Sequence, residues 1–242
     1  MHGLILAGGE GSRLAASGVA TPKALVPIGG VPQLLRLVRT FERLGCASLT
    51  CMVREGVGLA PIAGDLARVS PHLTIRVCRT PSSLHTLVLG LEQVPPGEVF
   101  CSMVDTVMAT VDWARAYQMS RRALGRGADA ALAVTPFIDD ERPLFAAYGD
   151  DHRVTGIGDE PVTPPRVTGG LYAFSGRARA VARATLAAGH SRMRALLGEL
   201  VRQGYDVRAV EIAKIIDLDC KGDLEGANAW LEFCEGGGLP MG

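Results

Sequence analysis

The sequence has no excess charge of either sign, because its 25 basic and 25 acidic residues cancel. Proteins that attract DNA, RNA or an anionic membrane through a general electrostatic field carry an excess of positive charge. We therefore expect neither a nucleic-acid partner nor a membrane partner. Any anionic ligand would have to be held by local groups of the protein.

The sequence also lacks a long apolar run and a close-spaced pair of cysteines. No apolar stretch reaches the roughly 18 residues that are typical of a transmembrane helix, and strand-like sequence begins at residue 3, which argues against a signal peptide. The six cysteines include no CxxC pair, so we expect neither a zinc site nor a disulfide framework. These absences predict a cytoplasmic protein, and they leave open whether it forms a homo-oligomer.

Lysine is scarce, since only Lys23, Lys214 and Lys221 are lysines among the 25 basic residues. Where arginine fills nearly every basic position, a remaining lysine indicates either a specific role or chance. Lys23 is the most interesting of the three, because it directly follows a proline that restricts the preceding loop.

Strands and helices alternate through the first half of the chain. Short apolar runs bounded by glycine are typical of strands that are buried on both faces. Such strands are predicted at 4–7, 49–53, 73–78, 99–104 and 130–134, and helices at 32–44, before 69, at 84–94 and at 111–124. The alternation predicts βαβ units in a Rossmann-like, three-layer α/β sandwich whose mixed central sheet is mostly parallel.

The second half of the chain is less regular. We expect strands at 144–149, 153–157, 167–174, 206–212 and 214–218, and helices at 177–188, 192–203 and 223–234. There is neither an internal repeat nor a linker. The simplest organisation is therefore one domain over residues 1–235, followed by a glycine-rich tail at 236–242 that we expect to be frayed.

A glycine-rich loop follows the first strand, with Gly8, Gly9 and Gly11 close together. Glycines at this point let the backbone approach a ligand and direct N–H groups toward an anion. The loop does not fit GxGxxG, because Leu14 stands where the third glycine would be, and the chain has no GK[ST] triplet of a P-loop. A dinucleotide-binding oxidoreductase is therefore disfavoured.

A longer pattern does match. The segment 4–13, with AGG-x-G-x-R, is followed by the PK-x-L-x-P of 22–27 and by a helix from Pro32. Together these residues resemble the N-terminal signature of the sugar-phosphate nucleotidyltransferase family. The resemblance implies transfer of a nucleoside monophosphate from an NTP to a phosphorylated small acceptor, such as a sugar 1-phosphate or a related phosphate or phosphonate, with release of pyrophosphate.

Charge considerations lead to the same chemistry. Nucleotidyl transfer builds negative charge on the departing pyrophosphate, and fixed cations lower that barrier. Arg13 could grip the β- and γ-phosphates with its forked donors, and Lys23 could place a point charge at the α-phosphate. For Arg13, an ordinary surface position is an equal alternative. The nucleotide itself is expected to contact Leu6, Ala7, Gly8, Gly9, Gly11, Ser12, Pro81, Ser82 and Ser83.

The reaction also calls for Mg²⁺, with Mn²⁺ as the alternative, and hence for carboxylate oxygens. Asp105 follows the apolar strand 99–104, at the edge where parallel sheets bind ligands. The resemblance makes it the aspartate that contacts metal and nucleotide. A second ligand is expected from Asp217 or Asp219, which we place on one face of a strand, with a slight preference for Asp219.

The acceptor is expected to lie along Gly169, Gly170 and the preceding Thr168, which resemble the G-[IL]-Y strand of the family. Relatives often carry Glu-Lys-Pro shortly before this strand, and here Glu160 stands at the place of that lysine. Another cation must then meet the acceptor phosphate. We expect Arg166, with Lys214 as the alternative that regular strand alternation would point away.

Two further departures keep other functions open. The loop 80–85 differs from the segment with which relatives often read the base, and His85 is expected to be a helix residue rather than a general base. The opening signature is shared with molybdopterin-type guanylyltransferases. A catalytically inactive relative that binds sugar nucleotides as a regulatory subunit is a further alternative, disfavoured by the retained Arg13, Lys23 and Asp105.

Overall fold

The computed structural model describes residues 1–139 and 142–235, and its N-terminal half is a parallel sheet. Strand β1 lies at the centre, between β4 and β6, and β5 extends the sheet beyond β4. These strands are β1 (His2–Ala7), β4 (Leu49–Arg54), β5 (Leu73–Cys78) and β6 (Val99–Met103). Because all four run in one direction, the loops that follow them meet at the same edge of the sheet.

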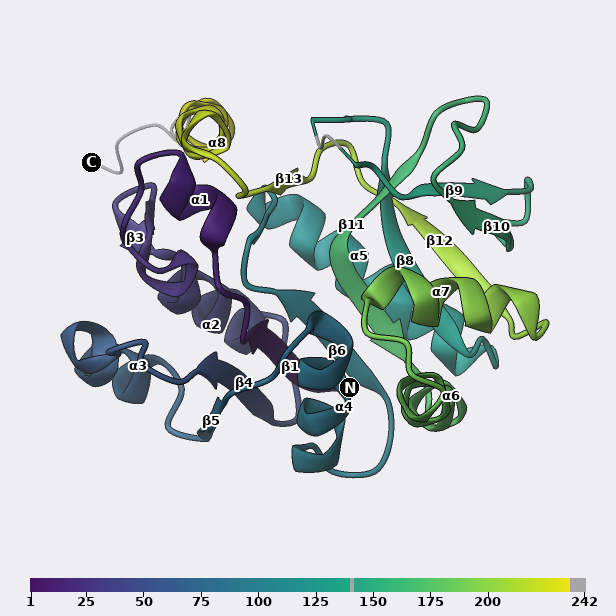
Figure 1. Ribbon diagram of the computed structural model, residues 1–242, viewed down its shortest axis with the longest axis horizontal. Helices are drawn as coiled ribbons and strands as arrows, with labels where there is room; N and C mark the ends of the chain where they lie inside the picture. The colour runs from purple at the N-terminus through teal and green to yellow at the C-terminus, as the bar shows by residue number, and fades with distance from the viewer. Residues whose placement is uncertain (140–141, 236–242) are drawn as a thin grey trace, which may run out of the picture.

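The C-terminal half extends the same sheet with mixed strand directions. Strand β11 (Val167–Phe174) runs antiparallel to both β6 and β8 (Ala130–Thr135), and β12 (Val207–Glu211) runs parallel to β8. Strands β9 (Phe145–Tyr148) and β10 (Val154–Gly158) form an antiparallel pair beside the start of β11. The whole is a nine-stranded mixed sheet (Figure 1).

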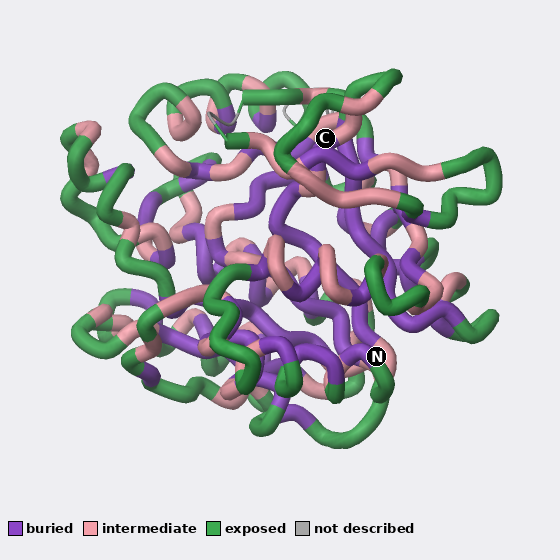
Figure 2. Tube along the Cα trace, turned by 45° about the vertical axis from the view of Figure 1, so that its right-hand side comes forward, coloured by how far each residue is buried: buried purple, intermediate pink, exposed green. Residues whose placement is uncertain are grey.

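Helices cover both faces of this sheet. One face packs against α2 (Gln33–Arg43), α3 (Ala63–Val69) and α5 (Thr110–Gly125). The other packs against α4 (Ser83–Gln93), α6 (Gly176–Ala187) and α7 (Met193–Arg202). The buried residues follow the central strands through the molecule, whereas the exposed ones lie on outer helices and loops (Figure 2).

Helix α2 illustrates how the sequence places these layers. Its apolar residues, Leu34, Leu37, Val38 and Phe41 among them, are fully buried. They recur at helical spacing, so that one stripe faces the sheet while the arginines face outward. The ring of Phe41 contacts Phe100 of β6 at a centroid distance of 5.4 Å, which ties this layer to the centre of the sheet.

Short elements complete the edge where the parallel strands end. Strand β7 (Thr106–Val107) pairs with β13 (Ile216–Asp217), apart from the main sheet. The others are α1 (Ser12–Ala16), the 3-10 turns η1 (Lys23–Leu25) and η2 (Ala60–Ile62), the pair β2 (Pro27–Ile28) and β3 (Val31–Pro32), and α8 (Lys221–Glu235). The α1 and η1 segments, strand β7 and the β2–β3 pair were not predicted.

The α/β sandwich with a mixed, largely parallel central sheet is confirmed. One element needs correction: the expected strand at 214–218 is only two residues long and pairs with β7. The tail predicted at 236–242 lies outside the described residues. Within residues 1–139 and 142–235, no helix has the length and apolarity needed to cross a membrane.

Candidate active site

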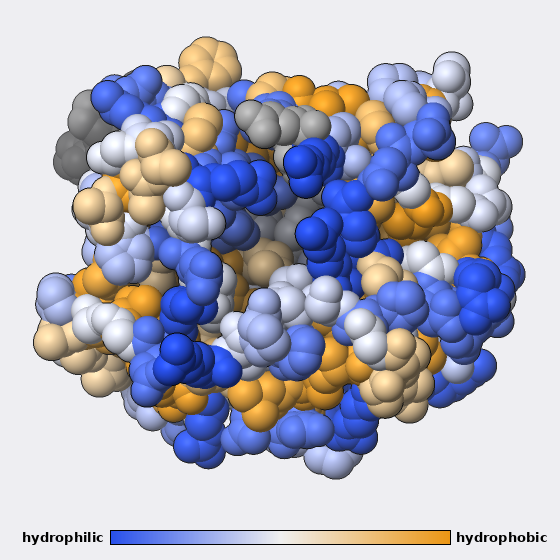
Figure 3. Space-filling view, in the orientation of Figure 1, coloured by the Kyte–Doolittle hydropathy of each residue, from blue (hydrophilic) through white to orange (hydrophobic). Residues whose placement is uncertain are grey.

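A cleft of about 780 Å³ opens at the edge of the sheet where β1 and β6 end. In the view of Figure 3, the surface of the molecule is hollowed near its middle, and hydrophilic side chains surround the hollow. Residues from both halves line it: Ser12, Arg13, Pro81, Ser82, Ser83, Met103, Asp105, Arg142, Leu144, Thr168, Gly170, Tyr172, Arg192, Met193, Arg194, Asp217 and Asp219.

The loop after β1 is shaped by its glycines. Gly11 has a φ of 63°, in the left-handed region that glycine adopts without strain, and it starts helix α1. A Cβ on Gly8 would lie 2.9 Å from the side chain of Thr86, so the loop passes closely over helix α4. Arg54 steadies the loop by donating to Glu10 at 2.7 Å.

Lys23 lies between two carboxylates. Its Nζ is 2.8 Å from Oδ2 of Asp105 and 2.8 Å from Oδ1 of Asp219, and its side chain is only 12% exposed. Burial by itself lowers the pKa of Lys23, but the charges and hydrogen bonds of Asp105 and Asp219 outweigh it and hold that pKa raised. The ammonium is therefore charged at neutral pH and lies against two carboxylates that line the cleft.

Arg13 extends this charge cluster toward solvent. Its Nη1 forms an ion pair with Oδ2 of Asp219, the oxygen that Lys23 does not use. The Arg13 side chain is 64% exposed. An exposed guanidinium that lines the cleft can reorient toward an incoming anion, which a fully buried one could not do without loss of packing.

Backbone contacts bring the two carboxylates together across the chain. The N–H of Leu218 donates to the carbonyl of Asp105 at 3.1 Å, continuing the pairing of β13 with β7. Asp223 then accepts from the backbone N–H groups of Asp219 at 2.8 Å and Cys220 at 2.7 Å. This turn before α8 holds the Asp219 side chain toward Lys23.

Asp217 behaves differently from Asp219, although we expected the two on one strand face. The strand ends at Asp217, which is half-buried and lines the cleft; its Oδ1 is buried and has no hydrogen-bond partner. Burial, reinforced by the charges of Asp105 and Asp219, raises the pKa of Asp217 well above its usual range. Asp219, beyond the strand end, is instead ionically paired.

The donor set suits a hard divalent cation. Oxygens of Asp105 and Asp219 already converge on one positive charge, and the unpartnered Asp217 oxygen is buried close by. Within residues 1–139 and 142–235, no group of three or more His, Cys, Asp or Glu side chains is arranged to hold a metal. Mg²⁺ in nucleotide enzymes is commonly held by only one or two carboxylates together with phosphates and water.

Every residue predicted to contact the nucleotide borders the cleft or one of two cavities beside it. Leu6, Gly8 and Gly9 line a cavity of about 190 Å³ next to Ser82 and Ser83. Ala7, Gly9, Gly11 and Lys23 line another of about 250 Å³. Arg54 borders both cavities and was not predicted. His85 is a helix residue, as expected, and its ring nitrogen contacts Ser82 Oγ at 2.8 Å.

The residues predicted for the acceptor divide into two groups. Thr168 and Gly170 line the cleft. Gly169 is turned inward, where a Cβ would lie 2.5 Å from Ile215, and the exposed Glu160 is not among the lining residues. Arg166 borders a separate cavity of about 360 Å³ beside Tyr148.

Lys214, the alternative cation, is also elsewhere. Its ammonium lies 4.1 Å from the ring centre of Phe137 and 5.2 Å from that of Trp230. Such cation–π contacts hold a lysine against aromatic faces rather than toward a ligand. Neither of the two cations considered for the acceptor phosphate is therefore among the residues that line the cleft.

Three arginines that the sequence did not single out line the cleft instead. Arg192 and Arg194 lie at the start of α7, and Arg142 precedes β9. Arg194 forms an ion pair with Asp159 and donates to the carbonyl of Arg142 at 3.2 Å. Arg192 is exposed and has no ion pair within the described part of the chain. The sequence does show arginines close together near residue 190, but composition alone does not indicate that they line a cleft.

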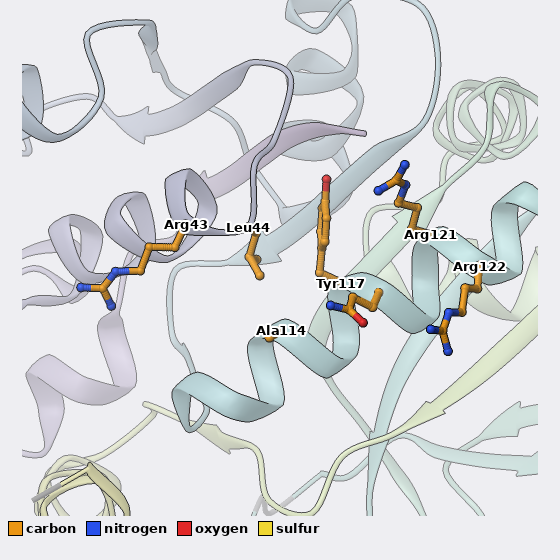
Figure 4. A pocket seen from close by; sticks show the side chains of 7 residues that line it. Arg43, Leu44, Ala114, Tyr117, Arg121 and Arg122 are labelled. Atoms are coloured by element: carbon orange, nitrogen blue, oxygen red, sulfur yellow. The ribbon is translucent and has the colours of Figure 1, made fainter. Parts of the chain in front are cut away.

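A second hollow, of about 510 Å³, lies between the end of α2 and helix α5. Tyr117 stands at its centre in Figure 4, while the side chains of Arg43 and Arg122 point away from the ring. None of the residues predicted for the site lines this hollow. Its charged groups do not converge, in contrast to those of the cleft.

Comparison with known proteins agrees with the sequence signature. Residues 3–204 match the family model described as the MobA-like NTP transferase domain. A glucose-1-phosphate thymidylyltransferase from Actinoplanes sp. is 26% identical over 179 residues, which cover 72% of this chain and 58% of that relative. The alignment thus spans little more than half the length of the curated relative.

Solved structures share the fold at low sequence identity. The inositol-1-phosphate CTP transferase from T. maritima is 14% identical, with a TM-score of 0.76 over 96% of both chains. The nucleoside-diphosphate-sugar pyrophosphorylase from Vibrio cholerae RC9 is 17% identical, with a TM-score of 0.72 over 93% of this chain and 99% of that one. These likenesses extend through the antiparallel half of the sheet as well as the parallel half.

Proposed function

From the premise that this chain belongs to the family of MobA-like NTP transferase domains, we propose that it is a nucleotidyltransferase. It transfers a nucleoside monophosphate from an NTP to a phosphorylated small acceptor, a sugar 1-phosphate or a related phosphate or phosphonate, and releases pyrophosphate. One observation carries the proposal: Lys23 and Arg13 form ion pairs with Asp105 and Asp219, two carboxylates that line one cleft.

The reaction needs positioning and charge neutralisation rather than a protein nucleophile. An oxygen of the acceptor phosphate attacks the α-phosphorus in line. The bond from that phosphorus to the bridging oxygen of the β-phosphate breaks, and pyrophosphate leaves with the electron pair. Lys23 is placed to neutralise charge at the α-phosphate, and Arg13 to hold the departing phosphates.

The loop of Gly8, Gly9 and Gly11 supports this arrangement, because its backbone can approach the triphosphate without side chains in between. Asp105 and Asp219 would hold Mg²⁺, or Mn²⁺ in its place. When bound, that ion supplies a positive charge that shields the phosphates from the attacking anion. Asp217, whose pKa is raised by desolvation and by the charges of Asp105 and Asp219, is the less suitable second ligand.

For the acceptor we propose Arg192, with Arg142 and Arg194, as the groups that meet its phosphate. They line the same cleft as Thr168 and Gly170, and they supply the positive charge that Glu160 cannot. Arg192 is the most available of the three, because Arg194 is paired with Asp159. Forked guanidinium donors suit a phosphate dianion.

A molybdopterin-type guanylyltransferase is the second candidate, favoured by the description of the matching family model. The deciding experiment is a matrix of the four NTPs against phosphorylated sugars, polyols, phosphonates and molybdopterin, read as pyrophosphate release. The matched control is Lys23→Ala, which should lose the signal. If no pair releases more pyrophosphate than this variant while NTP still binds, the chain is a binding protein and the proposed activity is wrong.

A further inference from the structure

Lys23 is held by carboxylates of the protein itself. Its ammonium bonds to Asp105 and Asp219 at 2.8 Å each, and within residues 1–139 and 142–235 it has no other side-chain hydrogen-bond partner. The remaining oxygen of Asp219 is taken by Arg13. The two carboxylates are thus neutralised by cations of the protein itself.

The oxygens that hold Lys23 are those proposed to hold the divalent ion. Hard cations such as Mg²⁺ and Mn²⁺ bind carboxylate oxygens at about 2 Å. An ammonium in contact with the same two oxygens competes by charge repulsion and by occupying space. A metal can therefore bind well at Asp105 and Asp219 only when the ammonium moves.

The surroundings of Lys23 leave it a second position. Its stem runs along the glycine-rich loop, since a Cβ on Gly11 would lie 3.4 Å from Lys23 Cγ. Lys23 also borders the cavity of about 250 Å³ beside Gly9 and Gly11. Rotation about the terminal bonds of the flexible stem would carry the ammonium from the carboxylates toward that loop.

We propose that Lys23 is an internal counter-ion that couples metal binding to NTP binding. In the free protein it holds the charge of Asp105 and Asp219 and keeps the divalent ion weakly bound. An incoming triphosphate draws the ammonium to itself and frees both carboxylates for the metal. This rests on the proposed function for the identity of the anion. Coupling between two ligands is reciprocal, so metal also tightens NTP binding.

The test measures Mn²⁺ binding to the nucleotide-free protein, by the electron paramagnetic resonance signal of the free ion. Lys23→Met removes the competing charge and keeps the stem length. Its Kd for Mn²⁺ should fall about tenfold or more, within the range typical of site-to-site coupling. The matched control is Lys221→Met, which removes an exposed lysine that forms an ion pair with Glu225 and should leave the Kd unchanged.

Unchanged or weaker Mn²⁺ binding by Lys23→Met would overturn the proposal. Because loss of the cation between Asp105 and Asp219 could disturb folding, Lys23→Gln is measured in parallel, and both variants are checked by circular dichroism and Tm. Adding Asp105→Asn to Lys23→Met should remove the gained affinity, which locates the ion. If Mn²⁺ binding tightens but the wild type releases no pyrophosphate with any NTP, the counter-ion role stands and the proposed activity fails.

Discussion

The two halves of the cleft are built by different means. In the N-terminal half, residues 2–107, the groups that border the cleft lie at or after the ends of parallel strands, in short loops and at the first residues of α1 and α4. In the C-terminal half, residues 130–219, the cleft is bordered by one face of the antiparallel strand β11, by the start of α7, by the segment before β9 and by Asp217 and Asp219. The first half presents small residues together with Arg13 and Asp105, whereas the second presents three arginines and two aspartates.

This difference has a physical basis. Parallel strands place their carboxyl ends at one edge, so that the loops after β1 and β6 must meet. Strand β11 instead crosses the cleft wall with a register shift between Thr168 and Tyr172 and a φ of 25° at Gly170. In such an irregular strand, successive side chains do not simply alternate between the two faces of the sheet. Recognition in this half therefore depends on chain segments far apart in sequence.

The largest effect should come from the N-terminal half. Lys23→Ala should lower kcat for pyrophosphate release by about 10² to 10³, because one preorganised charge at the reacting phosphate is lost. Lys221→Ala serves as the control, since that lysine is exposed. Turnover of Lys23→Ala within about threefold of the wild type would remove Lys23 from the catalytic site.

In the C-terminal half, Arg192→Ala should raise the KM for the acceptor about tenfold, which corresponds to 1.4 kcal/mol. The KM for NTP should stay nearly unchanged, as expected when binding common to ground and transition states is removed. Arg166→Ala is the matched control and should leave the acceptor KM within about twofold, since Arg166 borders another cavity. A shift for Arg166→Ala alone would reverse these assignments.

A pair of glycine variants sharpens the contrast between the halves. Gly170→Ala should lower the unfolding free energy by about 1–3 kcal/mol, because a Cβ there would lie 2.0 Å from Thr106 Oγ1 at a φ of 25°. Gly9→Ala should leave Tm unchanged, since no atom lies within 4 Å of its Cβ position, yet raise the KM for NTP several-fold. Thermal melts measure the change in stability, and NTP saturation curves measure the change in KM. The reverse pattern would mean that Gly9 serves packing and Gly170 binding.

The smallest effect concerns Asp217. Because the pKa of Asp217 is raised in the folded protein, the unfolded chain loses this proton at a lower pH than the folded one. The free energy of unfolding therefore falls as the pH rises above the ordinary pKa of 3.8. Asp217→Asn should therefore raise Tm by a few degrees at pH 7.5, since about 1 kcal/mol moves the Tm of a chain this size by 2–4 °C, and by less at pH 4.5. The exposed Asp150→Asn is the control. A lower Tm at pH 7.5 would show that ionised Asp217 is stabilised.

The sequence signalled the N-terminal half well because its signals are local. The apolar run of β1, the glycines after it and the proline before Lys23 each act over a few residues. The residues predicted from them border the cleft and its two adjoining cavities. Asp105 was found in the same way, as the residue after a buried strand.

Alternation failed where the backbone departs from a regular strand. Asp217 and Asp219 were expected on one face, but the strand ends at Asp217, and the turn capped by Asp223 directs Asp219 to Lys23. Arg166 was chosen as the nearest cation in sequence. The available arginine, Arg192, is separated from Thr168 by the whole of β11 and α6, a juxtaposition that only packing of α7 against the sheet creates.

The sequence by itself determined the α/β architecture, the glycine-rich loop after β1 and the place of Asp105 after a buried strand, because these patterns act over a few neighbouring residues. Only the tertiary structure decided that Lys23 bridges Asp105 and Asp219, that an oxygen of Asp217 is buried without a partner, and that Arg142, Arg192 and Arg194 line the cleft. These contacts depend on where a strand ends and on how distant segments pack. The distances between charged groups therefore follow from packing and not from spacing in the sequence.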